Sequence, residues 1–215
     1  GKPTIGFAGW AKLSLGQRLR TLAKELPIRS ISLFNDRYRA CTRGIFWREK
    51  ALHVLKRSSC VEPLLRIRRS FSANKATAEN DLSLLREEMV ETILASDYAL
   101  DVRGDANNSA RLFEILSLGR IPVILDTERN FPFRDKVDYH SFALIVDFRD
   151  LARLPERISE LHKKISPEDF EGMQRNARAA FVSFFRVDAA ARHIMEELQR
   201  RLPANLSTQT SFVSQ

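Results

Sequence analysis

The segment 98–126 constrains the fold most, because it reads as a strand, a helix and a second strand joined by short loops. Tyr98–Val102 and Ile121–Asp126 are apolar runs of strand length. Between them, Ser109–Leu118 has helical spacing and is followed by Gly119, a common helix terminator. Two strands connected through a helix pair in parallel, with a right-handed crossover. We therefore predict an α/β protein with a parallel sheet flanked by helices.

The residues before this segment extend the same pattern. Ile5–Trp10 is predicted as a strand, and a helix follows from Leu15 until Pro27 interrupts it. Apolar and polar residues alternate over Ser30–Phe34, which predicts the next strand. A further helix is expected from Asn80 or Asp81 to Leu94.

The last third of the chain is predicted to be helical after a strand at Phe142–Phe148. Asp150, Ser166 and Asp188 are expected to cap three helices, since short polar side chains bond the free N–H groups of a first turn. Pro203 ends the last helix. We expect one domain over residues 1–203 and a disordered, Ser/Thr/Gln-rich tail over residues 204–215.

The composition of the 215-residue chain points to anionic partners. Its net charge is +8, and eleven Lys and Arg residues stand against two acids, Glu49 and Glu62, within residues 37–75. Such a basic segment could contact lipid phosphates, an acidic membrane face or a nucleic acid, or could be a solvated insertion, which we favour. The two cysteines, Cys41 and Cys60, fit a reducing compartment, and we expect a cytoplasmic location, with peripheral membrane contact left open.

The loop and helix after the strand at 98–102 carry the candidate binding residues. The helix begins at the carboxyl edge of the predicted sheet, where open α/β folds bind ligands. Arg111 lies in its first turn and Arg103 precedes the Gly104 loop, although cations are disfavoured at this positive end of a helix. A diphosphate between the two arginines, bound also by the Ser109 hydroxyl and loop N–H groups, would explain the pattern.

Glu114 follows Arg111 by three residues, on the same helix face. Its carboxylate could accept hydrogen bonds from the two hydroxyls of a ribose. The alternative is that Arg111 and Glu114 form an ordinary surface ion pair.

The segment 103–124 resembles the signature of the exostosin-like glycosyltransferases (GT47), in which Arg-Gly is followed by four residues, by Ser-x-Arg-x-x-Glu and then by Gly-x-Ile-Pro-Val. Further likeness lies in Gly6-Phe7-Ala8-Gly9, which is similar to the opening strand of the family, and in Phe131-Pro132-Phe133 and Val137-Asp138-Tyr139. The resemblance covers residues 3 to 185. It departs from the family's pattern at Phe131, in place of Leu, and at Tyr139, in place of Trp.

The resemblance implies a Rossmann-like domain, the carboxyl-terminal, donor-binding half of a two-domain GT-B glycosyltransferase. Its donor, a nucleotide diphosphate sugar such as a UDP-sugar, would meet Arg103, Gly104, Ser109, Arg111 and Glu114. The acceptor would be a glycan or a lipid-linked glycan, and a fragment without the amino-terminal acceptor domain could be inactive. The catalytic base is expected in that other half, so none is assigned here.

Cofactors and alternative functions complete the predictions. GT-B enzymes usually need no metal, and the four histidines show no ligand spacing, so neither a metal nor another cofactor is expected. No nucleic acid is expected as a partner, because no nucleic-acid module accompanies the basic segment. The alternatives are a non-enzymatic basic module that binds nucleic acid or an acidic membrane surface, and an inactive transferase-like domain.

Overall fold

The computed structural model describes residues 1–68 and 81–201, and its centre is a five-stranded sheet in the order β2-β1-β3-β4-β5. Every pair of neighbouring strands is parallel. The strands are β1 (Thr4–Trp10), β2 (Glu62–Arg68), β3 (Tyr98–Asp101), β4 (Ile121–Asp126) and β5 (Leu144–Asp147). The predicted α/β fold with a parallel, Rossmann-like sheet is confirmed.

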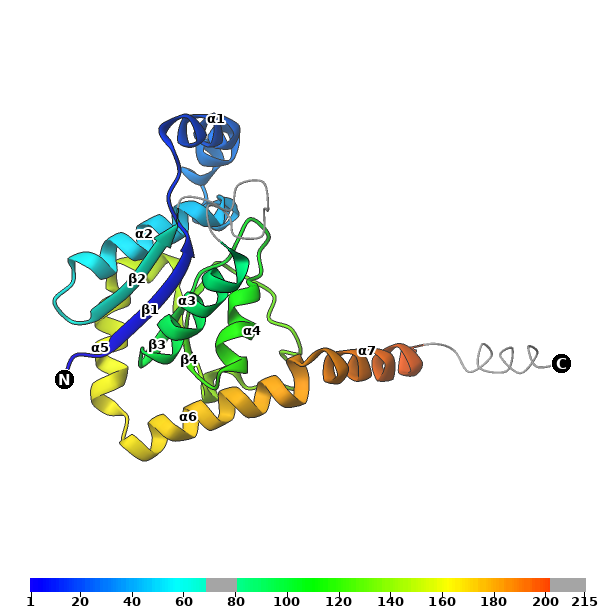
Figure 1. The fold of residues 1–215 in the computed structure, drawn as a ribbon. Helices are drawn as coiled ribbons and strands as arrows, with labels where there is room; N and C mark the ends of the chain where they lie inside the picture. The colour runs from blue at the N-terminus through cyan, green and yellow to red at the C-terminus, as the bar shows by residue number, and fades with distance from the viewer. Residues whose placement is uncertain (69–80, 202–215) are drawn as a thin grey trace.

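Helices cover both faces of the sheet (Figure 1). One face packs against α2 and α5, and the other against α3, α4 and α6. The helices are α1 (Leu15–Ser32), α2 (Gly44–Arg57), α3 (Leu82–Leu94), α4 (Ala110–Ser117), α5 (Leu154–Lys164), α6 (Pro167–Ala180) and α7 (Val187–Arg201). Short 3₁₀ segments are η1 (Asp36–Cys41), η2 (Tyr139–Ser141) and η3 (Phe148–Arg153), and a π-helical turn, η4 (Phe181–Phe185), joins α6 to α7.

The central strands are buried on both faces, as expected of a parallel sheet between two helical layers. All four residues of β3 are buried, and so are the first five of β4. Side chains on one face, including Tyr98 and Leu100, form the larger core with α2 and α5. Ala99 and Ile124 face the other layer. Gly119 ends α4 with a φ of +62°, the left-handed conformation expected of a helix terminator.

The prediction of a strand at Ser30–Phe34 is wrong, because α1 runs through Pro27 and ends at Ser32. Pro27 removes one helical N–H, but it lies on the exposed side of a helix that other bonds maintain. Ser14 and Gln17 form a reciprocal capping box at its start. Near its end, the Ser30 hydroxyl donates to the Leu26 carbonyl at 2.9 Å, in the i to i−4 pattern of helical serines.

The basic region is part of the domain and not a solvated insertion, so that expectation is corrected for its described residues. Its α2 buries Trp47, Ala51, Leu52 and Leu55 in the core, and its β2 pairs with β1 along the full length from Thr4 to Trp10. Residues 69–75 of this region, like the predicted tail at 204–215, lie outside the described residues.

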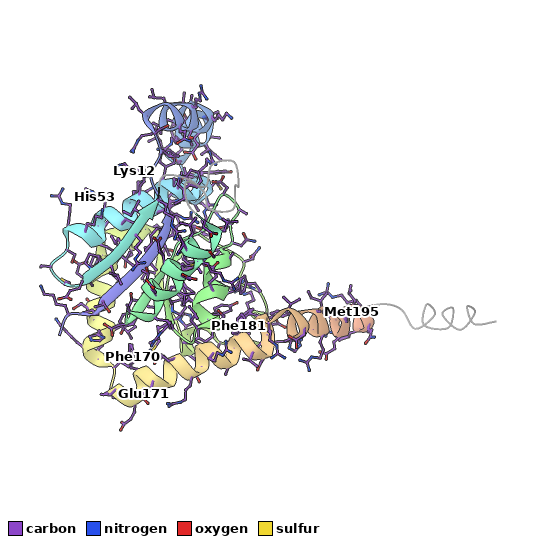
Figure 2. The ribbon with its side chains drawn as sticks, viewed as in Figure 1. Lys12, His53, Phe170, Glu171, Phe181 and Met195 are labelled. Carbon is purple, nitrogen blue, oxygen red and sulfur yellow. The ribbon has the colours of Figure 1, made fainter. Side chains whose placement is uncertain are left out.

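The helix starts in the last third were predicted with mixed success. Ser166 caps α6 by accepting from the Asp169 N–H at 3.1 Å. Asp150 caps no helix: Asp147 caps η3, and Asp150 pairs with Arg157 at 3.0 Å. Asp188 lies in the first turn of α7, which extends away from the sheet with Met195 on it (Figure 2). Among the described residues, no helix is long and apolar enough to cross a bilayer.

Candidate functional site

The strand order places a topological switch point at the carboxyl ends of β1 and β3. From β1 the chain reaches β2 on one side of that strand, whereas β3 lies on its other side. Ligands of open α/β sheets bind in the crevice that this reversal creates. The candidate site therefore lies where β1 ends at Trp10 and β3 ends at Asp101, with the start of α4 beside them.

Arg111 projects from the first turn of α4 towards the end of β1. Its guanidinium carbon lies 4.8 Å from the centre of the Phe7 ring, a cation–π contact. A Cβ at Gly9 would lie 2.8 Å from Arg111 Nη2, so a glycine there leaves the space that the guanidinium fills. Nη1 is buried and has no hydrogen-bond partner. A buried cationic donor without a partner is costly, and an anionic ligand would satisfy it.

Arg48 of α2 bridges the two strands of the switch point. Its Nη1 donates to the Trp10 carbonyl at 3.2 Å, and its Nε donates to the Val102 carbonyl at 3.3 Å. Burial, followed by repulsion from Arg111, lowers the pKa of Arg48 to about 10, so it stays charged at neutral pH. The sequence did not single out Arg48, because only the packing of α2 brings it to this edge.

Arg68, at the end of β2, adds a third cation to this edge. It repels Arg111 and helps to lower its pKa, after the larger effect of burial. Arg68 itself donates to Glu88 of α3 at 3.0 Å and to the Leu85 carbonyl at 2.6 Å. Three arginines from α2, β2 and α4 thus surround the switch point. Nη1 of Arg111 and Nε of Arg68 are both buried without a hydrogen-bond partner, and Arg111 also makes the cation–π contact with Phe7.

The structure corrects the expected pairing of Arg103 with Arg111. Arg103 is 3% exposed, and its guanidinium donates to the backbone carbonyls of Ala40 and Thr42 and, at 3.4 Å, to that of Asp105 in the loop before α4. Burial lowers its pKa. The guanidinium therefore fastens the end of η1 to the sheet. Its role as a donor ligand stays a prediction that this geometry does not support.

Ser109 and Gly104 frame the loop before α4. Ser109 is the N-cap residue of α4 and is 8% exposed, yet its hydroxyl makes no capping hydrogen bond. The Gly104 N–H donates to the Asn108 carbonyl at 3.2 Å and closes the loop. Asn107 ties the loop to Thr127, whose hydroxyl donates to it at 2.9 Å. The Ser109 hydroxyl is thus available at the start of a helix held in a fixed position.

Glu114 does not form the surface ion pair offered as the alternative reading. Both residues are in the described part of the chain, and no contact of 4.0 Å or less joins its carboxylate to Arg111. The carboxylate acts at longer range, raising the pKa of Arg111 against the larger effect of burial. Glu114 therefore keeps its acceptor oxygens available on the side of α4 that carries Arg111.

The carboxylate of Asp101 offsets part of the positive charge of Arg48 and Arg111. It is fully buried at the end of β3 and accepts from Arg129 Nη2 at 2.6 Å, while its other carboxylate oxygen has no partner. Its charge raises the pKa of both Arg48 and Arg111. Asp126, at the end of β4, accepts from the Arg129 N–H at 3.1 Å and so acts as a loop cap.

The two positions that depart from the family's pattern contact each other. The rings of Phe131 and Tyr139 have centres 4.7 Å apart, and the Tyr139 hydroxyl donates to the Pro132 carbonyl at 2.8 Å. Burial raises the pKa of Tyr139 above its usual range. The two residues that differ from the family's pattern, Phe131 and Tyr139, thus pack against each other after β4.

Acids of α3 pair with two cations of the basic region. Arg66 pairs with Glu91 of α3 at 3.2 Å and Arg68 with Glu88, which uses two cations of the basic region inside the fold. Arg69 is outside the described residues. Within residues 1–68 and 81–201, no three His, Cys, Asp or Glu side chains gather as a metal site would require.

Comparisons with known proteins identify the family that the chain resembles. Residues 55–161 match the exostosin GT47 domain. The chain is 25% identical over 118 residues to the Exostosin-1 homolog of Caenorhabditis elegans, covering 54% of this chain and 30% of that protein. It is 24% identical over 110 residues to a probable arabinosyltransferase, ARAD1, of Arabidopsis thaliana, covering 50% of this chain and 24% of that protein. The chain belongs to the exostosin GT47 family of glycosyltransferases.

Proposed function

We propose that this chain binds a nucleotide diphosphate sugar and serves as the donor-binding half of a GT-B glycosyltransferase. The observation that carries the proposal is Arg111, whose buried Nη1 lacks a partner at the switch point of a parallel sheet. Membership of the GT47 family supports glycosyl transfer in general. The chain spans a quarter to a third of the relatives it matches, so the activity of the whole protein is part of the proposal.

In the proposed complex, Arg111 and Arg48 neutralise the diphosphate at the start of α4. Burial removes both guanidinium groups from much of their water, which strengthens their bonds to phosphate oxygens. The Ser109 hydroxyl would donate to the same group. Glu114, one turn further along α4, would accept from the ribose hydroxyls. Arg103 and Gly104 would act by holding the loop that carries these residues.

The proposed reaction transfers the sugar from the diphosphate to a hydroxyl of a glycan acceptor. The bond between the anomeric carbon and the diphosphate oxygen breaks, and the acceptor oxygen forms a bond to that carbon. Its proton passes to a base, which we assign to the other half of the enzyme. The cations at the switch point stabilise the negative charge that develops on the leaving diphosphate.

A thermal-shift screen tests donor binding. A ligand that binds only the folded chain raises its melting temperature, by an amount that grows with the logarithm of the ratio of ligand concentration to Kd. UDP or GDP should stabilise the full chain, while uridine or guanosine at the same concentration should have little effect, because the diphosphate supplies most of the contacts. Stabilisation by no nucleoside diphosphate would contradict the proposal and would favour an inactive transferase-like domain.

A further inference from the structure

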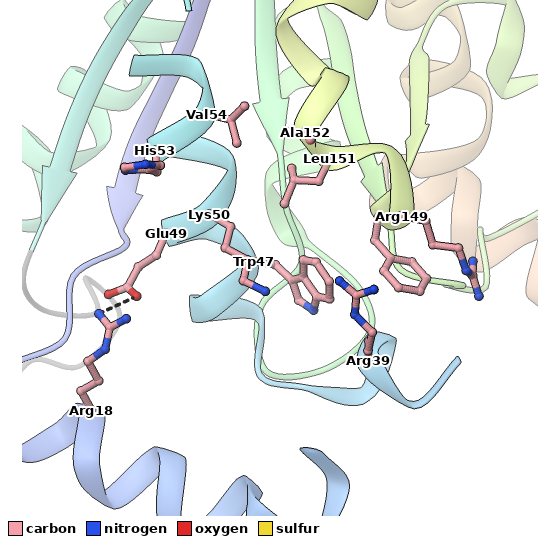
Figure 3. A pocket seen from close by; sticks show the side chains of 11 residues that line it. Arg18, Arg39, Trp47, Glu49, Lys50, His53, Val54, Arg149, Leu151 and Ala152 are labelled. Atoms are coloured by element: carbon pink, nitrogen blue, oxygen red, sulfur yellow. Dashed lines mark hydrogen bonds and ion pairs between the residues drawn. The ribbon is translucent and has the colours of Figure 1, made fainter. Parts of the chain in front are cut away.

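A cavity of about 530 Å³ lies between α2 and η3, away from the switch point (Figure 3). Trp47, Lys50 and Val54 form its α2 wall, and Phe148 and Leu151 form the opposite wall. None of the five predicted donor-site residues lines it. Its volume is within the range of small-molecule sites, roughly 300–1,000 Å³.

Trp47 supplies an unsatisfied donor in the wall of this cavity. The residue is 2% exposed, and its ring meets Phe148 edge to face at 5.3 Å between centres. Its indole Nε1 is buried and has no hydrogen-bond partner. In Figure 3 the nitrogen-bearing edge of the ring lies between the ends of Lys50 and Arg39. Buried indole N–H groups usually have an acceptor, so a ligand atom is a suitable partner here.

Lys50 adds a positive charge that no carboxylate of the described residues balances. Its ammonium lies 5.0 Å from the centre of the Trp47 ring. Burial, and then repulsion from Arg39 and Arg29, lowers its pKa. The one acid of the lining, Glu49, is already paired with Arg18 at 3.0 Å. The cavity thus presents the unpaired indole N–H of Trp47 and the ammonium group of Lys50, whereas the carboxylate of Glu49 is already paired.

We propose that this cavity binds a small molecule bearing an oxyanion, a carboxylate or a phosphate, through Lys50 Nζ and the indole N–H of Trp47. The oxyanion would offset the crowded positive charge and accept from both donors. The apolar walls formed by Val54, Phe148 and Leu151 would contact the rest of the molecule. The inference is independent of donor binding at the switch point, because none of the five residues predicted to bind the donor lines the cavity.

The two indole N–H signals of the chain, from Trp10 and Trp47, allow a direct test by NMR. The full chain is titrated in separate arms with inorganic phosphate, with glucuronate and with uncharged glucose. We expect the Trp47 signal to shift saturably with at least one of the two anions and not with glucose. The Trp10 indole, which donates to the Lys12 carbonyl at 3.0 Å, should stay in place. The anion that saturates at lower concentration distinguishes phosphate from carboxylate chemistry.

Variants on α2 separate a site from a general charge effect. Lys50→Gln should abolish the saturable shift, whereas Lys56→Gln, an exposed lysine of the same helix that does not line the cavity, should keep it. Trp47→Phe assigns the signal. The proposal is overturned if neither anion shifts the Trp47 indole, if glucose shifts it equally, or if Lys50→Gln responds as the unaltered chain does.

Discussion

Gly9 has no side chain, and the Arg111 guanidinium occupies the space that one would fill. Gly9→Ala would place a methyl group 2.8 Å from Arg111 Nη2 and displace it from the Phe7 ring. Because charge-assisted bonds to a diphosphate depend on this position, we expect UDP affinity to fall by about tenfold, or ~1.4 kcal/mol. Titration calorimetry measures the change.

Gly16→Ala is the matched control, since a Cβ at Gly16 meets no atom within 4 Å. It should leave UDP affinity unchanged. Equal affinities for Gly9→Ala and Gly16→Ala would show that the Arg111 position does not control binding.

Asp101 and Arg129 form a buried ion pair, and loss of either partner should lower the free energy of unfolding strongly. They are 0% and 3% exposed at the side chain, and their charged atoms are 2.6 Å apart. Arg129→Met leaves the carboxylate buried and unpaired, which should cost about 3–5 kcal/mol of unfolding free energy. Urea denaturation tests this, with Arg175→Ala as the control in an exposed pair, expected to cost less than about 1 kcal/mol. Similar losses for the two variants would contradict the assignment.

The sequence predicted where the site lies better than it predicted which residues form it. Arg111, Ser109 and Glu114 lie in one loop and the helix that follows, so their proximity can be predicted from local sequence. Arg48 is 63 residues before Arg111 and reaches the site only through packing of α2. Arg103 and Arg111 are close in sequence, which suggests a shared site, but the carbonyls of Ala40 and Thr42 accept hydrogen bonds from the Arg103 guanidinium.

At the scale of elements, the errors lie where tertiary context decides between patterns. Over Ser30–Phe34 the alternation is short, and the hydroxyls of its serines bond back to helical carbonyls. The strand β2 was missed because its charged residues and Pro63 obscure the alternation. Both features are typical of an edge strand, which β2 is. The central strands β3 and β4, the helices α3 and α4 and the terminator Gly119 were predictable because apolar runs and turn chemistry are local signals.

One carboxylate fastens α1 to the rest of the domain. Glu25 is 7% exposed, accepts from the Arg43 N–H at 2.6 Å and pairs with Arg29 at 2.9 Å. Glu25→Ala should therefore loosen α1, whose leucines are largely exposed, without unfolding the sheet. Hydrogen exchange should become faster, by about tenfold, in α1 and η1 alone. Lys24→Ala, an exposed neighbour, should leave exchange unchanged; no difference between the two variants would contradict the role of Glu25.

At the scale of the whole molecule, the chain is a Rossmann-like domain with its cations gathered at one sheet edge. The switch point, the helix start of α4 and the three arginines around them lie on the same edge of the sheet. On this account the site needs a diphosphate to balance its charge. The cavity between α2 and η3 is a separate place for an oxyanion, so nucleotide binding and anion binding should be separable by mutation.

Titration calorimetry of UDP into the full chain, beside Arg111→Ala and the exposed-arginine control Arg175→Ala, tests the central claim most directly. We predict saturable binding by the unaltered chain and by Arg175→Ala, and at least tenfold weaker binding by Arg111→Ala. Equal binding by all three proteins, or binding by none of them, would contradict the claim that Arg111 binds the donor's diphosphate.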